Sequence, residues 1–323
     1  MRALRQILFV AGLAVVAWLA TRIGFAPLVS SFTELSWRLA IVCVPYALVM
    51  AVDTLGLRYA FARTNISFLS LLGARLAGEA VNIITPLASV GGEAMKAWLL
   101  RRDARLGESV PALIIAKTTI TIAQTLFLML GIVAAWWVFP EGSNFLTTMW
   151  GLLGVEVLAV AGFVGTQLGG LFRRGGRLLK LVGSEGSAEH AQALDEALRA
   201  FYREQPRRLG LSIGFHLAGW VLGTIETLLV LHFLGAPVSI STALVIEAFG
   251  SAVRFATFMV PASLGTLEGA NVALFHGLGL GAGAGLTFSL VRRARQIVWV
   301  VIGLVALVLM RPVAKEPVAV AQA

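Results

Sequence analysis

The chain is poor in charge and in residues that bind metals or form disulfides. Of its 323 residues 13% are charged and 58% hydrophobic, and the mean hydropathy is +0.86, which excludes an ordinary soluble domain of this length. The single cysteine, Cys43, excludes an intrachain disulfide. We expect no metal site, because the histidines are scattered without ligand spacing: His190, His216, His232 and His276.

A nucleotide-binding loop is also missing. The glycine-rich stretch 277–285 contains no Gly-Lys-Ser/Thr sequence and follows no strand pattern, which excludes a phosphate-binding P-loop. We therefore expect neither a cofactor nor a step driven directly by a nucleotide.

Long apolar runs, in contrast, are abundant. They approach the roughly 20 residues that cross a hydrocarbon layer about 30 Å thick, and they cover residues 7–20, 39–57, 109–139, 145–168, 209–234 and 286–310. We predict an all-α polytopic membrane protein with about six transmembrane helices, in one membrane domain over residues 1–323. Residues 1–20 resemble a secretory signal but lack a small-x-small cleavage site before Thr21, so we expect an uncleaved first helix.

The net charge of +9 is distributed unevenly among the predicted loops. With the N-terminus inside, the outer loops carry only Arg22 and Arg38, and the other loop cations are cytoplasmic. This asymmetry is typical of a multi-pass protein of the bacterial inner membrane, here with both termini in the cytoplasm. We expect the basic stretch 173–180 to contact anionic lipid rather than nucleic acid.

One insert has the composition of a soluble segment, residues 173–208. Within it Ser187 is a candidate N-cap, and apolar residues follow at helical spacing: Ala191, Leu194, Leu198 and Phe201. We predict a cytoplasmic amphipathic helix that lies on the bilayer or on the ends of the membrane helices.

One motif occurs twice, beginning at Pro86 and again 175 residues later at Pro261. In each copy small residues lead to a glutamate seven positions on, and the helix-breaking residues are Pro86, Gly91, Gly92, Pro261 and Gly265. A proline with glycine-rich backbone breaks a helix and frees N–H groups, which hydrocarbon tolerates only where protein or a water-filled cavity covers them.

The same shift relates Glu79 to Arg254 and Lys117 to Arg292, which indicates a duplicated unit with halves at 1–139 and 145–311. The loop charges place the first break on the cytoplasmic side and the second on the outer side. We therefore predict an inverted repeat with two re-entrant broken-helix hairpins, an arrangement typical of secondary transporters.

Intramembrane charges gather near the two breaks and are expected to face protein rather than lipid. The candidate substrate-binding residues are Arg75, Glu79, Glu93, Lys96, Lys117, Glu247, Arg254, Glu268, Arg292 and Arg295, with Arg293 beside them. Two interpretations stay open: the cations hold a phosphate-bearing headgroup, or the charges are ion pairs that lock the broken helices together. For Asp53, a pair with Arg58 or a position near the membrane surface is favoured over a functional role.

At these residues the sequence resembles a known family. The segment from Gly91 to Arg102, with its Gly-Gly-Glu start and basic end, and the segment from Pro261 to Glu268 are similar to two motifs in the transmembrane, flippase-like region of lysylphosphatidylglycerol synthases. The second motif is usually Pro-Gly-x-x-Gly-x-x-Glu, and Ala262 replaces its first glycine. The run 268–275 with 290–295 further resembles the branch associated with hopanoid biosynthesis.

The resemblance covers nearly the whole chain and implies a stand-alone member of this family. Nothing resembles the aminoacyl-transferring domain of the full-length synthases, so lysyl transfer is not implied. We expect a non-enzymatic lipid translocator for a phospholipid, polyprenyl-linked or hopanoid-type lipid. The alternatives are a membrane-embedded lipid-phosphate phosphatase or transferase, for which no histidine stands near either motif, and a non-transporting scaffold for lipid-modifying enzymes.

Overall fold

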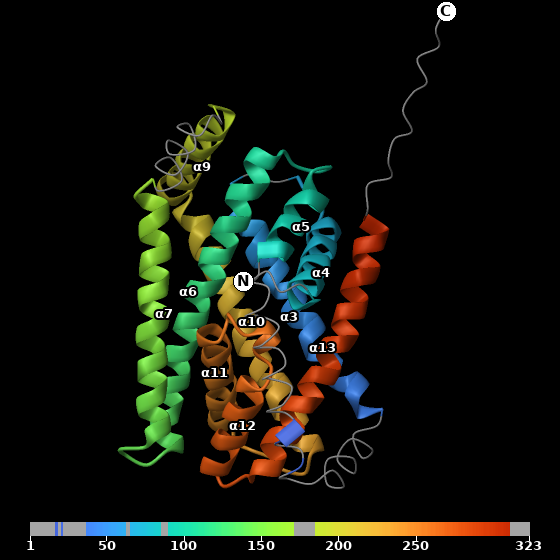
Figure 1. Ribbon diagram of the computed structural model, residues 1–323, viewed down its shortest axis with the longest axis vertical. Helices are drawn as coiled ribbons and strands as arrows, with labels where there is room; N and C mark the ends of the chain where they lie inside the picture. The colour runs from blue at the N-terminus through green and yellow to red at the C-terminus, as the bar shows by residue number, and fades with distance from the viewer. Residues whose placement is uncertain are drawn as a thin grey trace, which may run out of the picture.

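The computed structural model describes residues 17–18, 21, 37–62, 65–84, 90–170 and 185–310, and within these ranges it is helical without a strand. The helices, shown in Figure 1, are α3 (Arg38–Ala60), α4 (Phe68–Ile84), α5 (Val90–Leu100), α6 (Leu106–Val138), α7 (Asn144–Leu168), α9 (Glu185–Glu204), α10 (Pro206–Phe233), α11 (Ile240–Ala256), α12 (Thr266–Gly277) and α13 (Ala282–Met310). A short 3-10 turn, η1 (Pro261–Ser263), lies between α11 and α12.

Five of the described helices are long and apolar enough to cross a membrane: α3, α6, α7, α10 and α13. Each covers one of the apolar runs predicted as a transmembrane helix, which confirms the all-α polytopic class. The remaining predicted crossing, residues 7–20, lies almost wholly outside the described residues. Apolar side chains exposed along these helices, such as Leu158 of α7 and Leu309 of α13, suit a surface that faces hydrocarbon.

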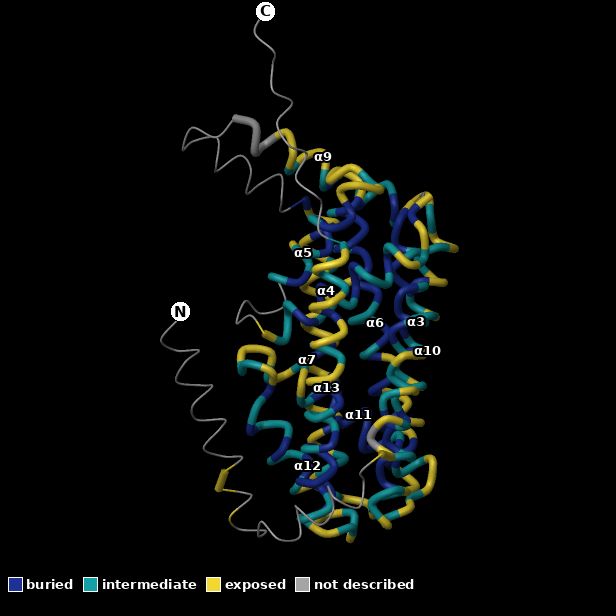
Figure 2. Tube along the Cα trace, turned by 90° about the vertical axis from the view of Figure 1, so that its right-hand side faces the viewer, coloured by how far each residue is buried: buried dark blue, intermediate teal, exposed yellow. Residues whose placement is uncertain are grey.

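Four short helices form two pairs, the first helix pair (α4 and α5) and the second helix pair (α11 and α12). The two pairs lie in opposite halves of the long axis in both views (Figures 1 and 2). The shift of 175 residues carries α4 onto residues 243–259 and α5 onto 265–275, close to the bounds of α11 and α12. The described ends of α4 and α5 and those of α11 and α12 therefore fall at related positions, as the duplicated motif predicts.

Each of these pairs packs on a long helix of the other half of the chain. The first pair contacts α13 through α4, and the second contacts α6 through α11, while α3 packs extensively on α10. The shift relates α6 to α13 and α3 to α10. The contact of α4 with α13 therefore corresponds to that of α11 with α6, and the contact of α3 with α10 corresponds to itself. This reciprocity is what an inverted repeat requires, but the inverted repeat and the re-entrant paths stay predictions.

The hydrophobic core is split into two clusters with a polar layer between them. On α6, Leu113 and Ile115 belong to the cluster around α4 and α5, whereas Phe127 and Ile132 belong to the cluster around α11 and α12. The residues of α6 between the two clusters include Lys117, which means that charge is held between two apolar regions.

The α9 helix lies across one end of the bundle, near the ends of α6 and α7 (Figure 1). Its predicted apolar stripe is confirmed in part, since Leu198 and Phe201 are buried against that end. Tyr202 donates a 2.6 Å hydrogen bond to Gln167 Oε1, and burial raises the pKa of its phenol above the ordinary value. The prediction for Ser187 was wrong: α9 already begins at Glu185, so Ser187 lies inside the helix rather than at its N-cap.

Candidate functional site

A cavity of about 420 Å³ lies in the polar layer between the two core clusters. Helices α3, α4, α5, α6, α10, α11 and α13 all contribute to its lining. Of the ten predicted substrate-binding residues, all but Glu268 line it: Arg75, Glu79, Glu93, Lys96, Lys117, Glu247, Arg254, Arg292 and Arg295. Among the other residues of the lining are two further acids and a histidine, namely Asp53, Glu226 and His216.

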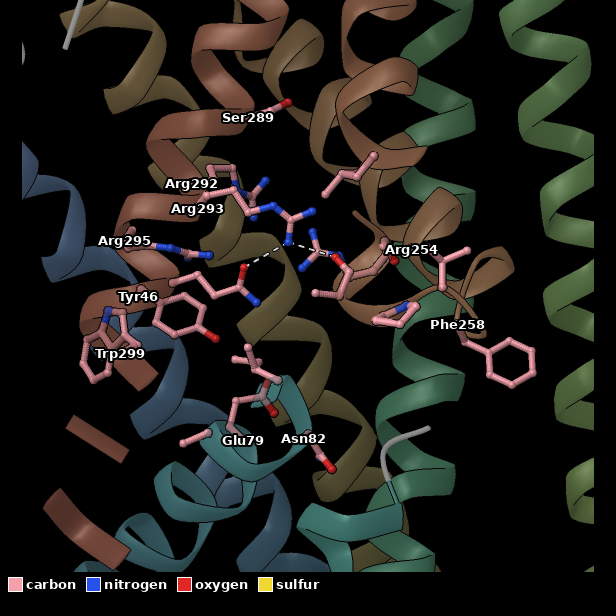
Figure 3. A pocket seen from close by; sticks show the side chains of 18 of the residues that line it. Tyr46, Glu79, Asn82, Arg254, Phe258, Ser289, Arg292, Arg293, Arg295 and Trp299 are labelled. Atoms are coloured by element: carbon pink, nitrogen blue, oxygen red, sulfur yellow. Dashed lines mark hydrogen bonds between the residues drawn. The ribbon is translucent and has the colours of Figure 1, made fainter. Parts of the chain in front are cut away.

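A second cavity of about 240 Å³ adjoins the first and shares with it Glu79, Arg254 and Arg292. It lies between the end of α4, the turn that follows α11, and α13 (Figure 3). Four arginines line this smaller cavity against a single carboxylate, that of Glu79: Arg254, Arg292, Arg293 and Arg295. Three of these arginines are bonded to carboxylates outside this lining, those of Glu247, Glu268 and Glu226, so Arg254 is the cation left for an anionic ligand.

The first ion-pair cluster in the lining of the larger cavity is centred on Asp53. Its carboxylate bonds to Arg75 Nη2 of α4 at 2.5 Å and to His216 Nδ1 of α10 at 2.8 Å, and the carboxylate is buried. The favoured interpretation of Asp53, as a partner of Arg58 or a group near the membrane surface, was therefore wrong. This cluster ties α3, α4 and α10 together, and breaking such a pair leaves an uncompensated buried charge.

The second ion-pair cluster joins α13 to α10 and α11. Arg292 forms two hydrogen bonds to the carboxylate of Glu247, at 2.5 and 3.0 Å, and Arg295 donates to Glu226 at 2.5 Å. Thr227 also donates to Glu247, at 2.8 Å. Glu226 was missing from the predicted set, although an acid inside an apolar run is itself a signal of a buried partner or site.

The two motif glutamates are paired in different ways. Glu93 lies in the first turn of α5 and bonds to Lys96 of the same helix at 2.8 Å. Glu268 lies in the first turn of α12, where it accepts a 2.7 Å bond from the N–H of Gly265 and another from Arg293 Nε. Glu268 thus caps the start of α12 and pairs it with α13, and it lies outside the lining of both cavities.

Three charged side chains of the cavities have no hydrogen bond or ion pair with any described residue: Glu79, Lys117 and Arg254. Lys117 and Arg254 are exposed in spite of their depth in the bundle, and both line the larger cavity. Their surface therefore faces that space. The other cations of the same cavity are occupied by carboxylates of the protein.

The backbone at the two breaks differs from the prediction in part. Pro86 lies outside the described residues, and Gly91 and Gly92 lie in the first turn of α5 rather than in a preceding turn. The Gly92 N–H donates to Asn82 Oδ1 of α4 at 2.7 Å, so the side chain of one helix satisfies the free backbone of the next.

In the second break, η1 begins at Pro261 and Gly265 has a φ of 79°. Ala262 and Ser263 also have positive φ, of 53° and 50°. Side chains disfavour this left-handed region, which glycine enters freely.

Two further observations bear on the chemistry of the site. Within the described ranges no group of three or more histidine, cysteine, aspartate or glutamate side chains is placed to hold a metal ion. Glu156, which the sequence places inside an apolar run, is buried on α7 and accepts a 3.0 Å bond from Gln124, a residue that lines the larger cavity. Glu156 itself is not in that lining.

The family model described as the lysylphosphatidylglycerol synthase TM region matches residues 5–304. The chain belongs to this family. No curated protein and no solved structure matches it significantly. The geometry accounts for the glycine that is usual in the second motif of lysylphosphatidylglycerol synthase TM regions, because this position has a left-handed backbone, which Ala262 adopts here at a cost.

Proposed function

We propose that this protein is a lipid translocator of the bacterial inner membrane, which moves a phospholipid, polyprenyl-linked or hopanoid-type lipid. Its anionic headgroup binds in the larger cavity, between the two helix pairs. The observation that carries the proposal is the state of Arg254 and Lys117, two cations that face this cavity without a carboxylate partner. A cation at this depth in a membrane protein is a functional-site candidate, and the exposed surface of these two leaves them open to an anionic ligand in the cavity.

The division of the cations into two kinds supports separate roles. Arg75, Arg292 and Arg295 have a structural role, because each is bonded to a buried carboxylate of another helix. Lys117 lies on α6, in the first repeat half, and Arg254 on α11, in the second. An anion bound by both cations therefore contacts both halves of the chain. A site shared between two repeat halves is where transporters with inverted repeats bind substrate.

The enzymatic alternative requires a nucleophile and a base within reach of the substrate. Among the described residues that line the larger cavity the one histidine is His216. Its Nδ1 is held by Asp53, while its imidazole ring packs against Gly56 of α3. Its Nε2 has no hydrogen-bond partner, but the imidazole is 1% exposed, so a lipid phosphate in the cavity does not reach this nitrogen. This burial supports a structural role for His216 and favours transport over hydrolysis.

The test is headgroup translocation in proteoliposomes that contain a fluorescent phosphatidylglycerol, measured by the fraction of label open to an external quencher. Arg254→Ala and Lys117→Ala are expected to abolish translocation and leave thermal unfolding in detergent unchanged. Arg254→Lys should retain part of the activity, since lysine keeps the charge but loses the bidentate geometry. Arg207→Ala, at an exposed site outside both cavities, is the control.

Three outcomes overturn the proposal. Translocation by Arg254→Ala at the rate of the unmodified protein excludes a headgroup site at Arg254. Absence of translocation by the unmodified protein, with phosphate released from the lipid instead, favours the enzyme. A stable protein with neither activity favours the scaffold.

The proposed orientation has a separate test, in a Cys43→Ala background. The inverted repeat with cytoplasmic termini predicts that an impermeant thiol reagent added outside modifies single cysteines at 140–144 and 277–285. It should not modify cysteines at 101–108 or 184–205. Modification from outside at 101–108 would contradict the inverted repeat.

A further inference from the structure

The smaller cavity contains polar atoms that the protein leaves without partners. Arg293 Nη2, Arg295 Nε and Trp299 Nε1 are buried N–H donors with no hydrogen-bond partner, and all three residues line this cavity. One buried acceptor is in the same state, Asn271 Oδ1. Buried donors are normally satisfied. Two of the three unused N–H groups belong to arginines of the lining, and donors in excess of the one acceptor indicate an oxyanion ligand.

The same cavity has an apolar rim. Phe258 and Met259, in the turn after α11, line it with 63% and 50% of their surface exposed. Figure 3 shows the ring of Phe258 directed away from the arginines, on the side opposite Arg295. Ile83, at the end of α4, lines the cavity as well. Exposed aromatic and aliphatic groups in a membrane protein face hydrocarbon, so the rim offers a surface for lipid chains.

We propose that the smaller cavity is a lateral lipid site, in which a lipid phosphate binds Arg254, Arg293 and the Trp299 N–H while the lipid chains pass over Phe258 and Met259 into the bilayer. The inference rests on the proposed function and specifies its substrate as a lipid with a phosphate next to its apolar chains. Arg254 lines both cavities, so the phosphate reaches the larger cavity without losing this contact. Glu79 lies across the cavity from the arginines (Figure 3), where it accepts a hydrogen bond from the headgroup.

Binding to the purified protein in detergent tests this site, with four probes: inorganic phosphate, glycerol 3-phosphate, dihexanoyl phosphatidylglycerol and dioctanoyl phosphatidylglycerol. If the rim binds chains, affinity rises from the glycerol phosphate to the dioctanoyl lipid, by roughly fourfold for each methylene that reaches the rim. Phe258→Ser combined with Met259→Ser should remove most of this gain and leave glycerol 3-phosphate binding unchanged. Equal affinity for all four probes identifies a free-phosphate site and overturns the lipid assignment.

Trp299→Phe tests the phosphate contact, because it removes the unused N–H and keeps a large aromatic ring. Loss of one hydrogen bond to a charged group predicts roughly tenfold weaker binding of the dioctanoyl lipid. Trp137→Phe, on an exposed residue of α6, is the matched control and should have no effect. We avoid Arg293→Ala because Arg293 also holds Glu268 and the Ala262 carbonyl.

The two proposals fail in different ways. If Trp299→Phe and the rim variant bind and transport lipid like the unmodified protein, while Arg254→Ala does not transport, the lateral site is wrong and the translocator stands. If Arg254→Ala transports normally, the proposed function itself is wrong.

Discussion

The two helix pairs place a glutamate at the same point, in the first turn of the short helix after the break, but the two carboxylates are used differently. Glu93 keeps 26% of its side chain exposed and bonds to Lys96 of its own helix. Glu268 is 1% exposed and joins the Gly265 N–H to Arg293 of α13. A repeated motif therefore fixes where a carboxylate stands, whereas its role depends on which neighbouring helix supplies a partner.

The pairs also differ in how closely their helices approach. In the first pair, a Cβ on Gly92 would meet the Gly78 carbonyl oxygen, so α4 and α5 touch through two glycines. The shift of 175 residues places Val253 and Leu267 at the corresponding positions of the second pair. The first pair is thus held by close backbone contact, and the second by its ion pair and its turn.

The largest expected difference between the two helix pairs is in the stability lost when the motif glutamate is removed. Glu268→Ala leaves Arg293 without its buried carboxylate and the Gly265 N–H without an acceptor, which should cost ~3–5 kcal/mol of unfolding free energy. Glu93→Ala leaves the mostly buried Lys96 without its carboxylate but removes a partner that is itself 26% exposed, so the cost should be smaller, about 1–3 kcal/mol. Thermal unfolding of the two variants in the same detergent measures the difference. Equal losses would show that the motif glutamates act alike.

A smaller effect is expected from the glycine contact. Gly92→Ala should cost ~1–3 kcal/mol, because the new Cβ meets a backbone oxygen that cannot move without separating α4 from α5. Gly269→Ala in α12 is the matched control, since its Cβ meets no atom within 4 Å. It should be neutral or stabilising by up to about 1 kcal/mol, as alanine favours the helix. A destabilised Gly269→Ala with a normal Gly92→Ala contradicts the assignment of close packing to the first pair.

The sequence predicted the long helices and the breaks because both depend on local properties, namely apolar length, proline and glycine. It also brought together the lining of the larger cavity, since intramembrane charges avoid lipid. Partner choice was not predictable: Asp53 bonds to Arg75 rather than to Arg58, and Glu226 bonds to Arg295. Those pairs depend on how each helix is rotated against its neighbours, which periodicity along one helix does not fix.

The smallest expected effect comes from the turn of the second helix pair, where the chain departs from its family motif. Ala262 has a φ of 53°, a conformation in which an alanine side chain crowds the backbone at a cost of roughly 1–2 kcal/mol. Ala262→Gly relieves this crowding, but the unfolded chain also gains freedom, worth roughly 0.5–1 kcal/mol. The net result should be a stabilisation of about 0.5–1 kcal/mol, seen as a slightly higher unfolding temperature.

Ser263→Gly is the comparison variant for that prediction. Ser263 shares the left-handed backbone, but its buried hydroxyl accepts a 3.1 Å bond from Thr257, which the glycine would lose. We therefore expect no gain at Ser263, since the lost hydrogen bond of about 1 kcal/mol offsets the relieved crowding. If Ala262→Gly destabilises the protein instead, the methyl group of Ala262 contributes packing that outweighs its strain. The family glycine would then serve the close approach of another group rather than the turn itself.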